Sequence, residues 1–216
     1  MTPPGRPRRW AAIAALAVAV PAAPAAGHPH GWIDVQSTVV FDGAGRITAL
    51  SLDWLFDDIY SVFILDGLPA DGEARGAALR EIARQDLENL REYGYFTDLR
   101  VDGARVETGM VDEFDTGLRD ERLWLRFTVP LQTPVDPRAD AVTFAVYDPT
   151  YFLEVLHVEE TPVILAGAGT AGCSARVRQP APTLEAIGLA ASLDRSESAG
   201  DTLGEVFAQW VTITCE

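Results

Sequence analysis

Several short segments of this chain alternate apolar and polar residues with a period of two, and this pattern most constrains the fold. Residues 46–56 and 123–131 are the clearest examples. Successive side chains of a β-strand point to opposite faces, so each segment predicts a strand with one buried face. By the same reasoning, strands are predicted over 32–41, 99–101, 105–108, 141–147, 154–165 and 173–178.

One long segment has helical periodicity instead. Residues 73–93 place apolar side chains at three- and four-residue spacing, and Gly94 is a suitable stop. A weaker helix is predicted over 203–210. Strands joined by tight turns such as Asp102-Gly103 form antiparallel sheets. The pattern therefore predicts an α+β fold in which one long helix packs on antiparallel β-sheet.

The N-terminus predicts a cleaved export signal. Arg6, Arg8 and Arg9 precede an apolar run over residues 10–20, and small residues lead to Gly27. That run is too short for the roughly 20 apolar residues that span a bilayer. Cleavage after Gly27 is expected, with cleavage after Ala25 as the alternative. We therefore predict a signal peptide over 1–27 and a single periplasmic domain over 28–216.

The expected mature chain is strongly acidic. All 17 basic residues are Arg, and the 14 that remain after cleavage face 32 carboxylates, a net charge of −18. Such a field repels nucleic acid and draws cations toward the surface. We expect no nucleic-acid partner and no membrane insertion after cleavage.

The chain has two cysteines, Cys173 and Cys215. In an oxidising compartment an isolated pair predicts a disulfide. It would close a loop of about 43 residues and restrict the unfolded chain by roughly 4 kcal/mol. We expect this bridge to fasten the C-terminus.

Two of the three histidines, His28 and His30, lie at positions 1 and 3 of the expected mature protein. A free α-amine and the imidazole of the same residue can chelate one metal ion, and imidazole suits Zn, Ni, Cu and Fe. We expect a divalent ion of Zn, Ni, Co or Cu. Pro29 has no N–H, so the chelate that uses deprotonated backbone amides cannot form. Any metal site must use side chains, the terminal amine and ligands from elsewhere in the fold.

Further ligands can be proposed from the strand pattern. Asp57 and Asp58 end the strand that follows the first one, and a carboxylate from either could join the two histidines. His157 is the third histidine and a further candidate ligand; its alternative interpretation is a partly buried strand residue. An unstructured terminus is the alternative for His28 and His30.

The chain resembles an uncharacterised bacterial periplasmic family that begins His-Pro-His-x-Trp after the signal. The resemblance rests on these segments in order: His28-Pro29-His30-Gly31-Trp32, Trp54-x-Phe56-Asp57, Tyr93-x-Tyr95-Phe96 and Asp148-Pro149-Thr150-Tyr151-Phe152. The family is described as the periplasmic component of an ABC-type transport system and is linked to nickel, cobalt or zinc permeases. The resemblance implies a metal role for His28, His30 and Asp57 and an inner-membrane permease as partner.

The expected function is thus that of a periplasmic accessory protein that binds a divalent transition metal for a transporter. No hydrolase, phosphate-binding or dinucleotide motif is present, so we do not expect an enzyme. Two alternatives remain: a copper enzyme built on an N-terminal histidine brace, with His157 as its remote ligand, and a non-metal interaction domain.

Overall fold

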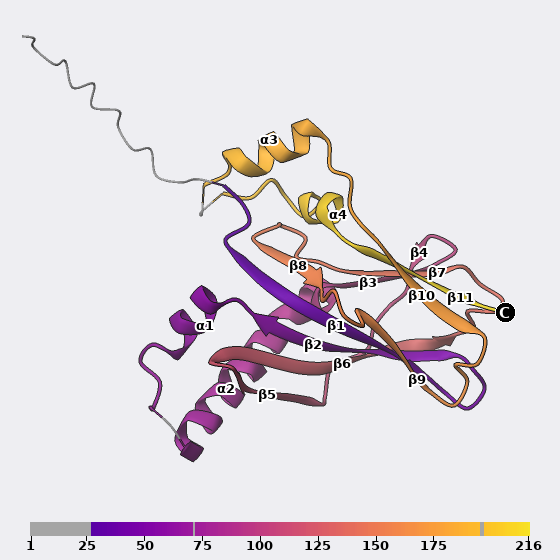
Figure 1. Cartoon of the computed structure of the whole chain (residues 1–216), viewed down its shortest axis with the longest axis horizontal. Coiled ribbons are helices and arrows are strands. Elements are labelled where there is room, and N and C mark those ends of the chain that lie inside the picture. Colours follow the sequence, from indigo (N-terminus) through magenta and orange to yellow (C-terminus); the bar gives the residue numbers. More distant parts are fainter. Residues whose placement is uncertain (1–26, 71, 195–196) are drawn as a thin grey trace, which may run out of the picture.

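The computed structural model describes residues 27–70, 72–194 and 197–216. These residues form two β-sheets and four α-helices (Figure 1), and the α+β prediction is confirmed. The predicted signal peptide lies outside the described residues, apart from Gly27. None of the described helices is long and apolar enough to cross a membrane.

The first sheet has six strands in the order β5-β6-β2-β1-β8, and β9 also pairs with β1. Its strands are β1 (Gly31–Phe41), β2 (Ile47–Phe56), β5 (Phe114–Arg119), β6 (Arg122–Val135), β8 (Leu153–His157) and β9 (Val163–Gly167). β1, β2, β6 and β5 pair antiparallel, whereas β8 and β9 run parallel to β1. The single strand predicted over 154–165 is therefore two strands, and the sheet is mixed at this edge.

The second sheet is wholly antiparallel, in the order β10-β11-β7-β3-β4. Its strands are β3 (Thr97–Val101), β4 (Ala104–Arg105), β7 (Val142–Val146), β10 (Cys173–Arg178) and β11 (Trp210–Cys215). The predicted hairpin turn joins β3 to β4, with positive φ at both Asp102 and Gly103. Two positive φ values are typical of a tight hairpin whose twist matches that of its strands.

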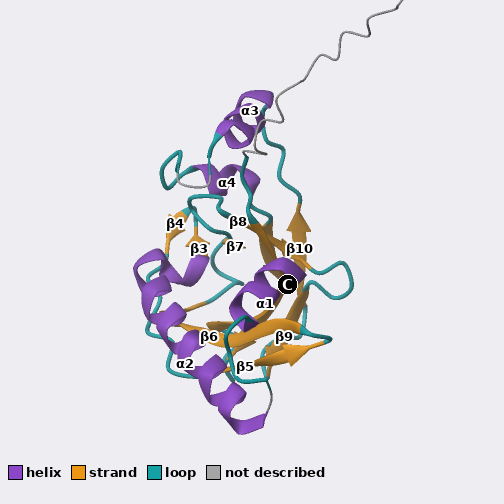
Figure 2. Cartoon of the chain, turned by 90° about the vertical axis from the view of Figure 1, so that its left-hand side faces the viewer, coloured by secondary structure: helices purple, strands orange, loops and turns teal. Residues whose placement is uncertain are grey.

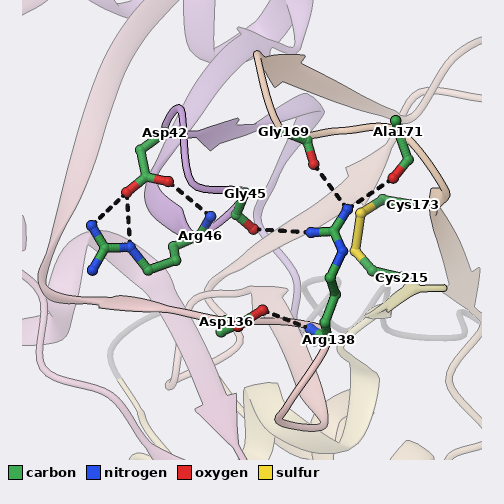
Figure 3. Close-up of a disulfide and its surroundings, with 9 residues drawn as sticks. All are labelled: Asp42, Gly45, Arg46, Asp136, Arg138, Gly169, Ala171, Cys173 and Cys215. Atoms are coloured by element: carbon green, nitrogen blue, oxygen red, sulfur yellow. Dashed lines mark hydrogen bonds and ion pairs between the residues drawn. A yellow bond between two sulfur atoms is a disulfide. The ribbon is translucent and has the colours of Figure 1, made fainter.

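The predicted disulfide is confirmed. Cys173 and Cys215 are direct partners in the pairing of β10 with β11, and their sulfurs are bonded. Beside the bridge, the guanidinium of Arg138 donates hydrogen bonds to three backbone carbonyl oxygens, those of Gly45, Gly169 and Ala171 (Figure 3). The bridge and this guanidinium together connect the last strand to the turns around it.

One hydrophobic core lies between the sheets. The inner face of β2 carries Leu50, Leu52 and Trp54, which are at most 1 % exposed. Buried residues of both sheets and of α2 (Gly72–Leu90) belong to the same cluster. α2 is the predicted long helix, and it packs through Leu79, Ala83 and Leu87. A short 3-10 helix (Arg91–Phe96) follows it and leads into β3.

Three short helices complete the fold: α1 (Asp58–Leu65), α3 (Leu184–Ser192) and α4 (Leu203–Phe207). Of these three, only α4 lies in a segment predicted to be helical, and it ends at Phe207 rather than at residue 210. α3 and α4 lie together at one end of the molecule, opposite α2 and β5 (Figure 2). α1 immediately follows β2, so it stands where β1 begins.

Candidate functional site

The two N-terminal histidines are held where β1 begins. The backbone N–H of His30 donates to the carbonyl oxygen of Phe152 at 2.8 Å, in continuation of the β1–β8 pairing. The backbone N–H of His28 donates to the carbonyl oxygen of Ala190 in α3 at 2.9 Å. The segment is thus fixed at two points by residues more than 120 positions away in the chain.

The two imidazole rings lie side by side. Their centroids are 4.8 Å apart, and the ring of Phe152 contacts both, at 5.8 Å from His28 and 5.0 Å from His30. His28 is buried, with 9 % of its surface exposed. Its Nδ1 atom is shielded from solvent and has no hydrogen-bond partner within the described part of the chain. A buried nitrogen in this state costs free energy unless a ligand satisfies it.

The neighbouring carboxylate, Asp57, holds the local backbone. Its Oδ1 accepts the N–H of Tyr60 at 2.9 Å and so caps α1, while its Oδ2 accepts the N–H of Trp32 at 2.8 Å. A side chain at Gly31 would come within 3.3 Å of that Oδ2 and within 2.9 Å of Leu153, so glycine suits this position. Asp57 therefore lies against the backbone just after His30, with both oxygens already hydrogen-bonded.

Asp58, the other predicted carboxylate, is directed to solvent. Its side chain is 86 % exposed and lies 3.9 Å from Nε of Arg122. Arg122 also pairs with Asp34 at 2.8 Å. This geometry makes Asp58 a partner of the arginine.

His157 is placed in β8, away from the N-terminal pair. It is opposite Val35, whereas Gly31 is opposite Leu153. His157 is therefore four residues of strand beyond the position opposite Gly31, a distance of about 13 Å at 3.3 Å per residue. Its ring is buried, with Nε2 3.1 Å from Ser37 Oγ and Nδ1 3.2 Å from Gln209 Oε1. Burial lowers the pKa of this imidazole, and the bond to Gln209 opposes that shift in part.

The described residues contain no group of three or more His, Cys, Asp or Glu side chains placed to hold one metal ion. The structure brings His28 and His30 together, and it places Asp57 beside Gly31 and Trp32. Another feature favours a cation near His28: the carbonyl oxygen that its backbone N–H contacts belongs to Ala190, in the last turn of α3. Carbonyl groups at the C-terminal end of a helix carry partial negative charge.

Two contributors to the site were not predicted from the sequence. Phe152 belongs to the Asp148–Phe152 segment that carries the resemblance, but that segment gave no indication of a ring contact with His28 and His30. Ala190 has no polar side chain, so only the fold could reveal that its carbonyl holds the His28 nitrogen.

Comparison with known proteins gives two relatives and one family. An uncharacterized protein of Haemophilus influenzae is 25% identical over 191 residues, 88% of this chain and 91% of the relative. An uncharacterized 15.5 kDa protein of Spirochaeta aurantia, encoded in the trpE 3' region, is 33% identical over 79 residues, 37% of this chain and 56% of the relative. The profile of one family matches residues 13–215. The chain therefore belongs to the family described as "Protein of unknown function (DUF1007)".

Proposed function

We propose that this chain is a periplasmic accessory protein that binds a divalent transition metal ion at its processed N-terminus and exchanges it with a membrane transporter. The observation that carries the proposal is the ring pair of His28 and His30, 4.8 Å apart, in which the buried Nδ1 of His28 has no hydrogen-bond partner among the described residues. A neutral imidazole nitrogen without a hydrogen-bond partner can offer its lone pair to an ion such as Zn, Ni, Co or Cu.

The terminal amine supplies a third nitrogen in this proposal. Cleavage after Gly27 turns the backbone nitrogen of His28 into an α-amine. That amine and Nδ1 of the same residue close a six-membered chelate ring around a metal ion. The nitrogen now lies 2.9 Å from the carbonyl oxygen of Ala190. An amine can donate one N–H to that oxygen and still offer its lone pair to the metal.

Incomplete coordination fits a role in metal transfer. Structural metal sites are closed by four protein ligands, whereas open sites keep a position for another molecule. Here His28, His30 and the amine leave at least one position open, and both oxygens of Asp57 are engaged by backbone N–H groups. A transporter that offers its own ligand could therefore take the ion without first unfolding this site.

The copper-brace alternative receives less support. It relies on His157 as a remote ligand, and both ring nitrogens of His157 are within hydrogen-bond distance of Ser37 or Gln209. In the proposal, His157 is a structural residue and the metal is cargo.

Calorimetric titration of the protein that begins at His28 with Zn²⁺, Ni²⁺, Co²⁺ and Cu²⁺ tests the proposal. We expect saturable binding of one ion of at least one of these metals. The variant His28→Ala/His30→Ala should lose it, whereas the control Asp58→Asn should retain it because Asp58 faces solvent. Equal binding by the double histidine variant would refute the assignment.

A further inference from the structure

A second candidate site is a partly open cavity where α1 and α2 meet the first sheet. There the structure contains a cavity of about 170 Å³. Four of the nine residues that line it are aromatic, namely Trp54, Phe56, Tyr60 and Phe96, and three are leucines. Asp86 and Asn89 of α2 add polar groups. Aromatic walls with a few convergent polar groups are typical of small-molecule sites.

Two of its polar groups lack a compensating partner in the described part of the chain. Trp54 is 1 % exposed, and its indole N–H has no hydrogen-bond partner in the described ranges. A buried donor in that state is costly unless something else accepts from it. Within the same ranges, Asp86 has no Arg or His within ion-pair distance. Burial raises the pKa of the Asp86 carboxyl, as expected for a carboxylate that has no nearby cation to stabilise its charge.

The walls and the carboxylate together define the chemistry of an occupant. The faces of Trp, Tyr and Phe attract ammonium cations, and aromatic cages with this property recognise quaternary ammonium ligands. Asp86 supplies a negative charge, and the −18 net charge of the expected mature chain concentrates cations near the surface. The indole N–H of Trp54 calls for an acceptor atom. The cavity is close in size to the roughly 150 Å³ that holds a benzene molecule.

We propose that this cavity binds a small organic ammonium compound that also carries an acceptor oxygen. The ammonium group lies against the aromatic faces near Asp86, and the oxygen accepts from the indole N–H of Trp54. The site shares no ligand with the proposed metal centre. Either proposal can therefore fail while the other stands.

Three matched probes test it on the metal-free protein that begins at His28. Choline carries both the quaternary charge and an oxygen, tetramethylammonium carries only the charge, and 3,3-dimethyl-1-butanol carries only the oxygen. Titration followed by calorimetry and by tryptophan fluorescence should show saturable binding of choline. Each analogue should bind at least about tenfold more weakly, as expected for loss of one favourable contact of this kind.

Variants on α2 test the role of the carboxylate. Asp86→Asn should weaken choline binding by at least about tenfold and reduce the preference for choline over 3,3-dimethyl-1-butanol to what the aromatic faces alone provide. Glu88→Gln is the matched control, because it removes the same charge from the same helix at an exposed position that pairs with Arg84. It should leave binding unchanged. Absence of saturable choline binding, equal affinity for choline and its neutral analogue, or an unaffected Asp86→Asn variant would overturn the proposal.

Discussion

At the scale of single residues, His157 shows how a buried polar group is satisfied. Its backbone N–H donates to Gln209 Oε1 at 2.7 Å, which identifies that atom as the amide oxygen. The Nδ1 atom faces the same oxygen, so Nδ1 carries the proton and Nε2 accepts from the Ser37 hydroxyl. The neutral ring thus joins β1 and β8 to the residue just before β11, and it connects the two sheets.

We predict that His157 titrates below the ordinary histidine value of 6.5, because burial disfavours the charged ring. Protonation then favours the unfolded chain, so this contribution to stability is complete above pH 6.5 and is lost as the pH falls toward the lowered pKa. In the variant His28→Ala/His30→Ala, His157 is the only one of three histidines left. An NMR titration of its ring should have a midpoint below 6.5; a midpoint at or above that value would contradict the account.

Asp86 has the opposite pH behaviour. Its pKa is raised from 3.8 by burial, so the folded protein holds the proton more tightly than the unfolded chain does. Its contribution favours folding at acid pH and is lost as the pH rises through the raised pKa. Asp86→Asn should therefore raise the melting temperature at pH 7, and the gain should shrink on acidification. The control Glu88→Gln should change the melting temperature little, and a less stable Asp86→Asn protein at pH 7 would count against this interpretation.

At the scale of elements, Asp57 joins α1 to the start of β1 through one carboxylate. Asp57→Ala removes the cap of α1 and the acceptor for Trp32, and it should lower the free energy of unfolding by about 1 kcal/mol or more in urea. Asp57→Asn keeps one acceptor oxygen and is as good a cap, so it should lose less. Equal losses in the two variants would show that the carboxylate does not cap α1.

The elements with strong local patterns were predicted well. Burial alternates residue by residue along most of the length of four predicted strands, β1, β2, β6 and β10. It recurs every four residues along the predicted helix α2. α1 was missed because apolar residues occupy its exposed face too, including Ile59, Val62 and Phe63 at 67–77 % exposure, so no single apolar stripe marks the helix. α3 was missed for the same reason, since its residues are apolar or small except for Glu185 and even the exposed face carries Leu184.

Pairing between distant elements could not be predicted from local pattern. β8 lies parallel to β1 although about 120 residues separate them, and that pairing brings Phe152 to the histidines. β5 was not predicted, because its sequence does not alternate apolar and polar residues; Asp115 lies in this edge strand opposite Arg126 and pairs with Arg80. The prediction of His28 and His30 as neighbours needed only their spacing. The positions of Asp57 and His157 around them needed the fold.

At the scale of the whole molecule, both proposed sites are sites for cations in a strongly acidic protein. A field of this sign raises the local concentration of cations and the rate at which they associate, and salt screens it beyond about 10 Å at 0.1 M. Asp57 connects the two regions, because it accepts from the backbone of Trp32 near the histidine pair and from that of Tyr60, which lines the Asp86 cavity. The acidic surface therefore serves both sites without contributing direct ligands.

The central claim is that the amine of His28 becomes a metal ligand once the preceding residue is removed. The most direct measurement compares metal affinity, by calorimetry, of two proteins that differ by one residue: one begins at Gly27 and the other at His28. Both retain His28, His30 and Asp57. The account predicts that the protein beginning at His28 binds Zn²⁺ or Co²⁺, which do not readily displace an amide proton, at least about tenfold more tightly, because only there do the α-amine and the imidazole belong to one residue. Equal affinity in the two proteins would contradict the account.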